Sequence, residues 1–204
     1  MRTVAILCAA RKTAYRDIEG LEIYDEVRDC RNFPGGMPMI AHPPCRRWTR
    51  YGMAMVKARL TRHNIETPEE EINAERELGL WCAQQVKEHG GILEQPAGSK
   101  LFAAAGIPLP GSPQGPDSFS LAIWQCWWGY PVRKGTWLYF RGISQFSIDI
   151  PFRLWNPPPG QQWYWYNRGK GSGNAHIRSH TVPALARWLV DLARTANVKQ
   201  EAVP

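Results

Sequence analysis

The chain has 204 residues, enough for one domain with a sizeable core, and its formal net charge of +7 favours nucleic acids or nucleotides as partners. Its five cysteines are scattered and contain no CxxC pair, which argues against a disulfide framework or a cysteine zinc site and favours a reducing compartment. No apolar run is long enough to cross a membrane and no signal-peptide pattern is present, so we expect a soluble cytoplasmic protein with no membrane partner.

The N-terminal segment predicts two strands of a parallel sheet. Residues 3–8 form a continuous apolar run of strand length, and residues 21–25 predict a second strand that ends in Asp25. An acid at the end of the second strand of a nucleotide-binding α/β fold commonly holds ribose hydroxyls. Asp25 is therefore a candidate cofactor ligand, with a solvated loop acid as the alternative.

The third predicted strand ends at a cysteine. Residues 37–41 are mostly apolar, and the following His-Pro-Pro stops the strand because proline removes backbone donors. Cys45 is thus expected at the carboxyl end of a strand, where open α/β sheets bind ligands. Arg46 and Arg47 follow directly, which suits an anionic substrate. The alternative is a small buried core cysteine.

A second predicted strand that is followed by a polar residue and a proline comes after a long predicted helix. Residues 46–66 predict an irregular basic loop, and the next segment predicts a helix from Thr67 to about His89 with Cys82 in the core. A short apolar strand then leads to Glu94 and a proline. Because parallel strands end at one rim, we expect Cys45 and Glu94 to lie side by side. A helix cap or a salt bridge is the alternative for Glu94.

The C-terminal part is harder to assign. Residues 120–128 fit either a strand or an edge helix, and residues 136–140 predict a strand. Residues 143–176 form an irregular stretch rich in Trp, Pro and Gly, and residues 183–193 predict an amphipathic helix capped by Thr181.

No histidine or cysteine spacing indicates a metal, and no P-loop is present, so we expect no metal.

Several short blocks together resemble the cytosine-C5 methyltransferase family, in the compact form that phages carry. Residues 40–45 are similar to the strand and Pro-Cys loop of its catalytic nucleophile, and residues 92–96 to the block whose glutamate binds the target base. Residues 128–134 resemble its Tyr-Gly-x-Pro-Gln-Arg-Arg block, and residues 178–192 its end region. The resemblance implies a single α/β domain over residues 1–204, with a mainly parallel, Rossmann-like methyltransferase sheet. It has no separate large target-recognition domain; residues 143–176 take that place.

The resemblance also implies roles for individual residues. Cys45 would add to C6 of cytosine, Glu94 would bind N3, and Arg133 would steady the base O2 or lower the thiol pKa. The substrate, DNA or a pyrimidine nucleotide, would contact Arg46, Arg47, Trp48, Gln95 and Lys134. S-adenosylmethionine would be bound by Cys8, Ala9, Ala10, Asp25, Asp29 and Pro43, although the loop at residues 8–13 lacks the family's glycines.

Two other interpretations remain open. An amino-methyltransferase acting on cytosine N4 or adenine N6 uses an Asp/Asn-Pro-Pro-Tyr loop, but here His42 and Cys45 stand in the amide and tyrosine places. A catalytically silent nucleic-acid-binding protein could keep the same fold and basic rim. In each case we expect a cytoplasmic location, including that of a phage-infected bacterial host.

Overall fold

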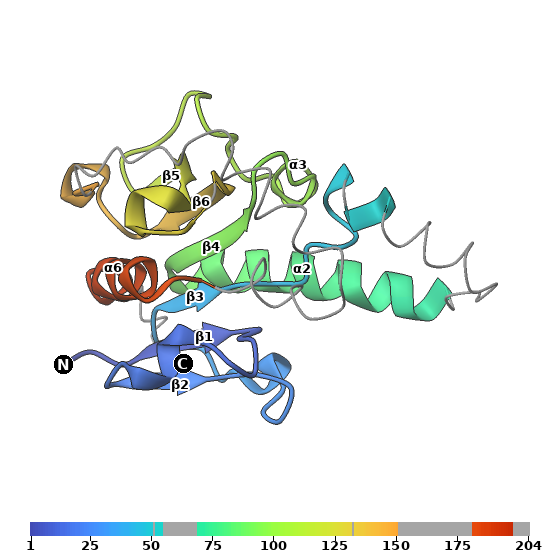
Figure 1. The fold of residues 1–204 in the computed structure, drawn as a ribbon, viewed down its shortest axis with the longest axis horizontal. Coiled ribbons are helices and arrows are strands. Elements are labelled where there is room, and N and C mark those ends of the chain that lie inside the picture. The colour runs from blue at the N-terminus through green and yellow to red at the C-terminus, as the bar shows by residue number, and fades with distance from the viewer. Residues whose placement is uncertain (51, 55–68, 132, 151–180, 198–204) are drawn as a thin grey trace, which may run out of the picture.

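The computed structural model describes residues 1–50, 52–54, 69–131, 133–150 and 181–197. Within them the chain forms one six-stranded sheet with the order β2-β1-β3-β4-β6-β5 (Figure 1). The first four strands of that order are parallel, whereas β6 runs antiparallel to both β4 and β5. The protein is therefore an α/β protein with a mostly parallel mixed sheet. The strands are β1 (Val4–Leu7), β2 (Leu21–Ile23), β3 (Met39–Ala41), β4 (Gly91–Pro96), β5 (Ser118–Trp124) and β6 (Gly135–Arg141).

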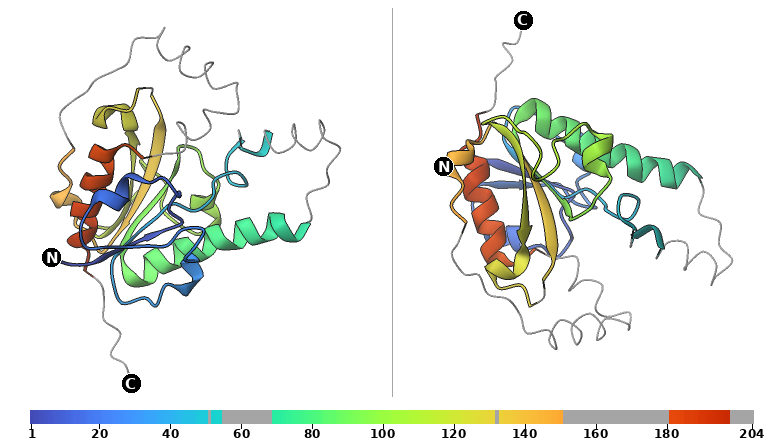
Figure 2. Two further views of the ribbon diagram at one scale, coloured as in Figure 1. Left: turned by 60° about the horizontal axis from the view of Figure 1, so that its bottom comes forward. Right: turned by 90° about the horizontal axis from the view of Figure 1, so that it is seen from above.

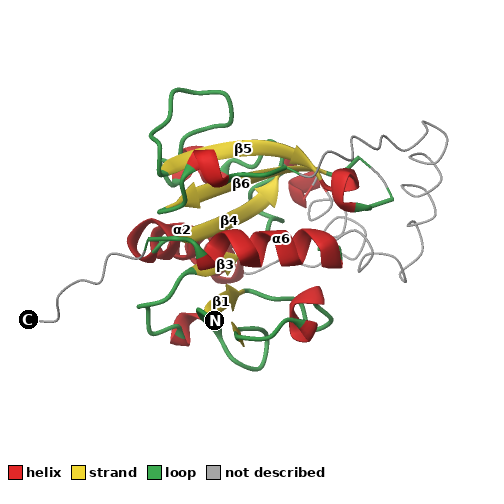
Figure 3. Ribbon diagram, turned by 90° about the vertical axis from the view of Figure 1, so that its left-hand side faces the viewer, coloured by secondary structure: helices red, strands yellow, loops and turns green. Residues whose placement is uncertain are grey.

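Two helices cover the two faces of this sheet. The helix α2 (Glu69–His89) packs on one face and α6 (Pro183–Arg194) on the other, as the right panel of Figure 2 shows. Figure 3 shows α6 lying across the middle strands, where it contacts β1, β3 and β4. No helix in the described part of the chain is long and apolar enough to span a membrane. The short helices are α3 (Leu101–Ala104), η1 (Ala14–Asp17), η2 (Cys30–Asn32), η3 (Gln125–Trp128) and η4 (Gln145–Ser147).

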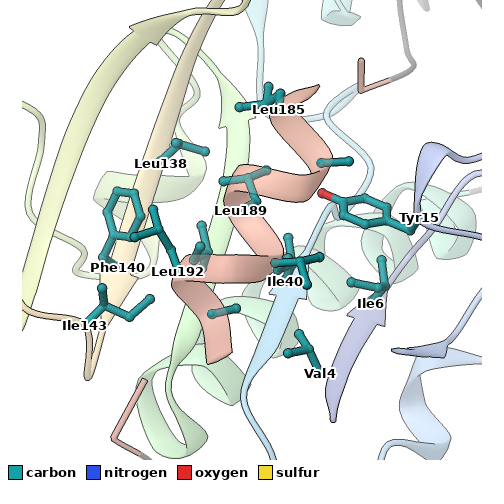
Figure 4. Close-up of a cluster of buried hydrophobic side chains, with 14 of the residues drawn as sticks. Val4, Ile6, Tyr15, Ile40, Leu138, Phe140, Ile143, Leu185, Leu189 and Leu192 are labelled. Carbon is teal, nitrogen blue, oxygen red and sulfur yellow. The ribbon is translucent and has the colours of Figure 1, made fainter. Parts of the chain in front are cut away.

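Strand side chains alternate between two separate apolar cores. In β3, Ile40 belongs to the core under α6, while Met39 and Ala41 belong to the core under α2. Figure 4 shows the first of these cores, with Leu189 of α6 facing the strands. Both faces are thus fully used for packing, which explains why the central strands read as continuous apolar runs.

Most predicted elements are confirmed, with two differences. The ambiguous segment 120–128 divides into the end of β5 and the one-turn helix η3, which Gly129 ends with a left-handed φ of 88°. The predicted cap of the last helix is wrong, because Val182 occupies the cap position and makes no side-chain hydrogen bond. Thr181 instead lines a cleft. The predicted basic loop after residue 54 and the irregular segment after residue 150 lie outside the described residues.

The α6 core generates the first prediction. Leu189 is 0% exposed, so Leu189→Ala should lower the free energy of unfolding by about 2–5 kcal/mol through lost burial and a residual cavity. Arg187→Ala, at an exposed position of the same helix, is the control and should change it by less than about 0.5 kcal/mol. Urea unfolding measures both. Equal effects of the two variants would contradict the packing of α6 on the sheet.

Candidate active site

A cleft of about 560 Å³ lies at the carboxyl ends of the parallel strands. Its walls are the segments that follow β1, β2 and β3, together with the C-terminal half of β4. The chain passes from β1 to β2 on one side and then returns to β3 on the other side of β1. Such a switch point opens a crevice beside the strand ends, which is where α/β sheets bind ligands.

The two residues expected to act together, Cys45 and Glu94, both line this cleft. Glu94 lies in β4, one residue beyond the Leu93 that pairs with Ala41 of β3. Cys45 follows β3 by four residues, after His42 and the two prolines. Parallel pairing of β3 and β4 therefore brings together two side chains that are 49 positions apart in the sequence.

A chain of polar contacts fixes the Glu94 carboxylate. Its Oε2 lies 3.2 Å from Nδ1 of His42, and Nε2 of His42 lies 2.9 Å from the Tyr15 hydroxyl. The Gln125 amide donates to Oε1 of Glu94 at 3.4 Å and to Thr136 Oγ1 at 2.9 Å. Glu94 is only 9% exposed, so these partners replace the water that the carboxylate has lost.

The protonation of Glu94 and Cys45 follows from their surroundings. Burial raises the pKa of Glu94, but the hydrogen bond from His42 and the positive charge of Lys134 outweigh burial, and the net pKa lies below its ordinary value. Burial and then the negative charge of Glu94 raise the pKa of the Cys45 thiol, which Lys134 counteracts in part. At neutral pH the pair is therefore a thiol beside a carboxylate.

Gln95 has a supporting role that the sequence did not indicate. Its Nε2 donates to the carbonyl oxygen of Pro43 at 2.7 Å, and its Oε1 accepts from Ser99 Oγ at 3.1 Å. Gln95 is buried, although it contributes to the cleft wall. It ties β4 to the Pro-Pro turn and so sets the path of the chain into Cys45.

The predicted cofactor ligands line the same cleft, on the side of β1 and β2. Asp25 is already engaged there: its Oδ1 accepts from the backbone N–H groups of Val27 and Arg28, and its Oδ2 pairs with Arg16. Those two N–H groups also lower the pKa of Asp25. Glu26, which sequence reasoning missed, is exposed beside it and lines the cleft. The predicted residues are Cys8, Ala9, Ala10, Asp25, Asp29 and Pro43.

Arg133 and Lys134 have different surroundings. The Arg133 guanidinium stacks on the Trp124 ring, 4.5 Å from its centroid, and is absent from the residues that line the cleft. Lys134 lines the cleft and acts electrostatically on both Cys45 and Glu94. Lys134 is thus the cleft-lining cation whose charge acts on both groups.

The other three predicted substrate contacts lie away from the cleft wall. Arg46 and Arg47 both form ion pairs with Glu75 of α2, the second with Nε 3.3 Å from Oε2. Trp48 is 3% exposed and packs in the core under α2, where its indole nitrogen lies 2.5 Å from the point that a Cβ on Gly79 would occupy. These residues fasten the loop after Cys45 to α2.

Three cysteines gather on the β1 side of the cleft. The Cys8 thiol donates a hydrogen bond to Cys30 Sγ at 3.4 Å, and Cys8 Sγ lies 3.7 Å from Cys82 Sγ. Hydrogen bonds from Cys8 and Cys82 lower the pKa of Cys30 to about 4, and the same contact with Cys30 raises the pKa of Cys8. The spacing of 22 and 52 residues explains why no sequence motif revealed the cluster.

The structure is that of an α/β protein with a cleft at a switch point of a mostly parallel sheet. In comparisons with known proteins, no family profile, no curated protein and no solved structure matches the chain.

The surroundings of Glu94 generate a prediction on stability. Because its folded-state pKa lies below the ordinary 4.5, the ionised carboxylate stabilises the fold above about pH 4.5, and this contribution is lost as the pH falls further. Glu94→Gln should therefore cost about 1–3 kcal/mol at pH 7 and progressively less below pH 4.5.

Chemical unfolding at several pH values measures this difference, and Glu77→Gln, at an exposed position of α2, is the control. A gap between wild type and Glu94→Gln that stays constant down to pH 3, roughly one unit below the ordinary carboxyl range, would contradict the lowered pKa.

Proposed function

We propose that this protein is a cytosine-C5 modifying enzyme of the S-adenosylmethionine-dependent methyltransferase type, acting on DNA or a pyrimidine nucleotide. One observation carries the proposal: a cysteine that follows β3 and a glutamate in the C-terminal half of the neighbouring parallel strand β4 line one cleft. A thiol and a carboxyl group at one site are what addition to a pyrimidine ring requires.

The chemistry assigns each group a step. The Cys45 sulfur forms a bond to C6 of the ring, and the electron pair of the C5–C6 double bond moves to C5 while N3 takes a proton from the Glu94 carboxyl group. The activated C5 attacks an electrophile. Solvent water then takes the C5 proton, which restores the double bond and expels the Cys45 thiolate, and N3 returns its proton to Glu94.

The resting and reactive forms of the Cys45–Glu94 pair hold the same number of protons and differ only in which group carries one of them. Cys45 begins as a thiol and Glu94 as a carboxylate, so transfer of the thiol proton to the carboxylate produces both reactive forms without changing the net charge. Lys134 lowers the pKa of Cys45, which favours the thiolate. His42 and Gln125 hold the carboxylate in place while the ring binds.

The other side of the cleft has features that suit the methyl donor. Asp25, Glu26 and Asp29 line it, and carboxylates match both ribose hydroxyls and a sulfonium cation. Cys8 has a φ of 57°, the left-handed conformation for which a glycine loop is normally needed. When bound, S-adenosylmethionine would supply the electrophilic methyl group. We assign the sheet to the Rossmann-like methyltransferase type on this basis.

A hydrogen-exchange assay tests the thiol step without any cofactor. Reversible addition at C6 labilises the C5 proton, so the wild type should exchange it for deuterium in D2O on dCMP or on single-stranded DNA containing cytosine. Cys45→Ser should abolish exchange, and Glu94→Gln should slow it by about 10²–10⁴-fold. Cys126→Ser, which alters a buried cysteine away from the cleft, should leave the rate unchanged.

Exchange that survives in Cys45→Ser would refute the nucleophile. Calorimetric titration with S-adenosylmethionine tests the methyl donor separately, because absence of binding would remove methyl transfer and leave the thiol addition standing.

The protonation states of Cys45 and Glu94 predict how the exchange rate depends on pH. The pKa of Glu94 lies below 4.5 and that of Cys45 above 9.0, so the sum of their protons stays constant between these values. The exchange rate at low substrate concentration should therefore be flat between about pH 5 and pH 9, and should fall outside that range. A profile that rises tenfold per pH unit through neutrality would show that Cys45 must lose its proton to solvent.

A second candidate is a nucleic-acid-binding protein of the same fold without turnover, because the raised pKa of Cys45 disfavours the thiolate and the net charge of +7 suits a polyanion. The exchange assay distinguishes the two. Salt-dependent DNA binding with no exchange under any condition would support the binding protein.

A further inference from the structure

The cysteine cluster beside the cleft carries an inference independent of the Cys45 chemistry. Cys8 follows β1, Cys30 begins η2 and Cys82 lies in α2, so three separate segments bring their thiols to one point. We propose that Cys8, Cys30 and Cys82 bind a zinc ion as thiolates. The protons that the three thiols still hold leave to solvent on binding.

The distances between the sulfur atoms fit a single small ion. Zinc–sulfur bonds of about 2.3 Å in tetrahedral geometry place the sulfurs about 3.8 Å apart. Here Cys8 Sγ lies 3.4 Å from Cys30 Sγ and 3.7 Å from Cys82 Sγ, and all three atoms lie within 4.8 Å of one another. A disulfide would need one pair to approach to about 2.05 Å and would leave the third thiol without a role.

The backbone at Cys8 is a second, independent observation. Among the residues that the structure describes, Cys8 is the one non-glycine with a left-handed φ. A β-carbon is strained in that conformation, and glycine would relieve the strain. A cysteine at this position contributes what glycine cannot, a sulfur atom directed at Cys30 and Cys82.

The surroundings also suit a zinc ion with one open position. Cys82 is 0% exposed and lies on the protein side, whereas Cys8 and Cys30 line the cleft, so the fourth position of the tetrahedron faces the cleft. Three thiolates and one zinc ion leave a single negative charge. Arg31 follows Cys30 directly and lines the cleft, where it pairs with Asp29 at 3.2 Å, so the two side-chain charges offset each other beside the site. Soft thiolate donors select zinc over magnesium or calcium.

The test uses the full chain with zinc, and cobalt as a spectroscopic substitute. Native mass spectrometry should find one zinc per chain, and cobalt should give a thiolate charge-transfer band. Cys82→Ala and Cys8→Gly should raise the zinc dissociation constant more than about 100-fold, since even changes outside the ligand sphere cost 10–100-fold. Cys45→Ser and Cys126→Ser should retain the ion and the band.

Cys8→Gly keeps the test decisive even if Cys82→Ala fails to fold, because glycine suits the φ of 57° at that position. Zinc should raise the melting temperature of the wild type and leave that of Cys8→Gly unchanged. A wild type that binds no stoichiometric zinc, a band that persists in Cys8→Gly, or a mass two hydrogens lower with Cys8 joined to Cys30 would overturn the proposal. Loss of cytosine exchange in Cys45→Ser with zinc retained would separate the two proposals.

Discussion

Parallel pairing of β1, β3 and β4 is the constraint on which the cleft depends. Their side chains alternate between the cores under α2 and α6, so neither face of the sheet is left for polar chemistry. Polar groups gather beyond the ends of β1 and β3 and in the last residues of β4, past its pairing with β3. Because all three strands end at one edge, segments that are remote in the sequence meet there, as His42 and Glu94 do.

The buried Glu94 carboxylate shows how this edge sets its electrostatics. Desolvation opposes ionisation, but His42 and Lys134 compensate for it, and the pKa falls. The same negative charge adds to burial in raising the pKa of Cys45. The carboxylate charge that His42 and Lys134 stabilise therefore disfavours a second negative charge on the Cys45 sulfur.

The sequence predicts more of the fold than of the site. Apolar runs predict β1, β3 and the start of β4, because buried parallel strands carry an unbroken apolar pattern; β2, which Glu22 interrupts, is only partly buried. The rule on strand ends predicts that Cys45 and Glu94 line one cleft, as they do. The antiparallel position of β6 between β4 and β5 has no local signal. The burial of Trp48 has no local signal either, because it depends on Gly79 in the helix α2. Charge alone suggested that Arg46 meets substrate, whereas a tertiary partner on α2 binds it.

The cysteines divide by their environment into two kinds. Cys45 lies outside the cluster of Cys8, Cys30 and Cys82, and its thiol is influenced by the Glu94 carboxylate and by Lys134, which suits a single reactive thiol. Cys8 shares its environment with two further thiols, and it lies in the loop where the resemblance leads one to expect glycine. A zinc ion there would anchor the end of β1 to α2 through Cys82. The loop after β1, which we propose lies beside the methyl donor, would then be held by metal coordination, and the conformational freedom of glycine would no longer be required.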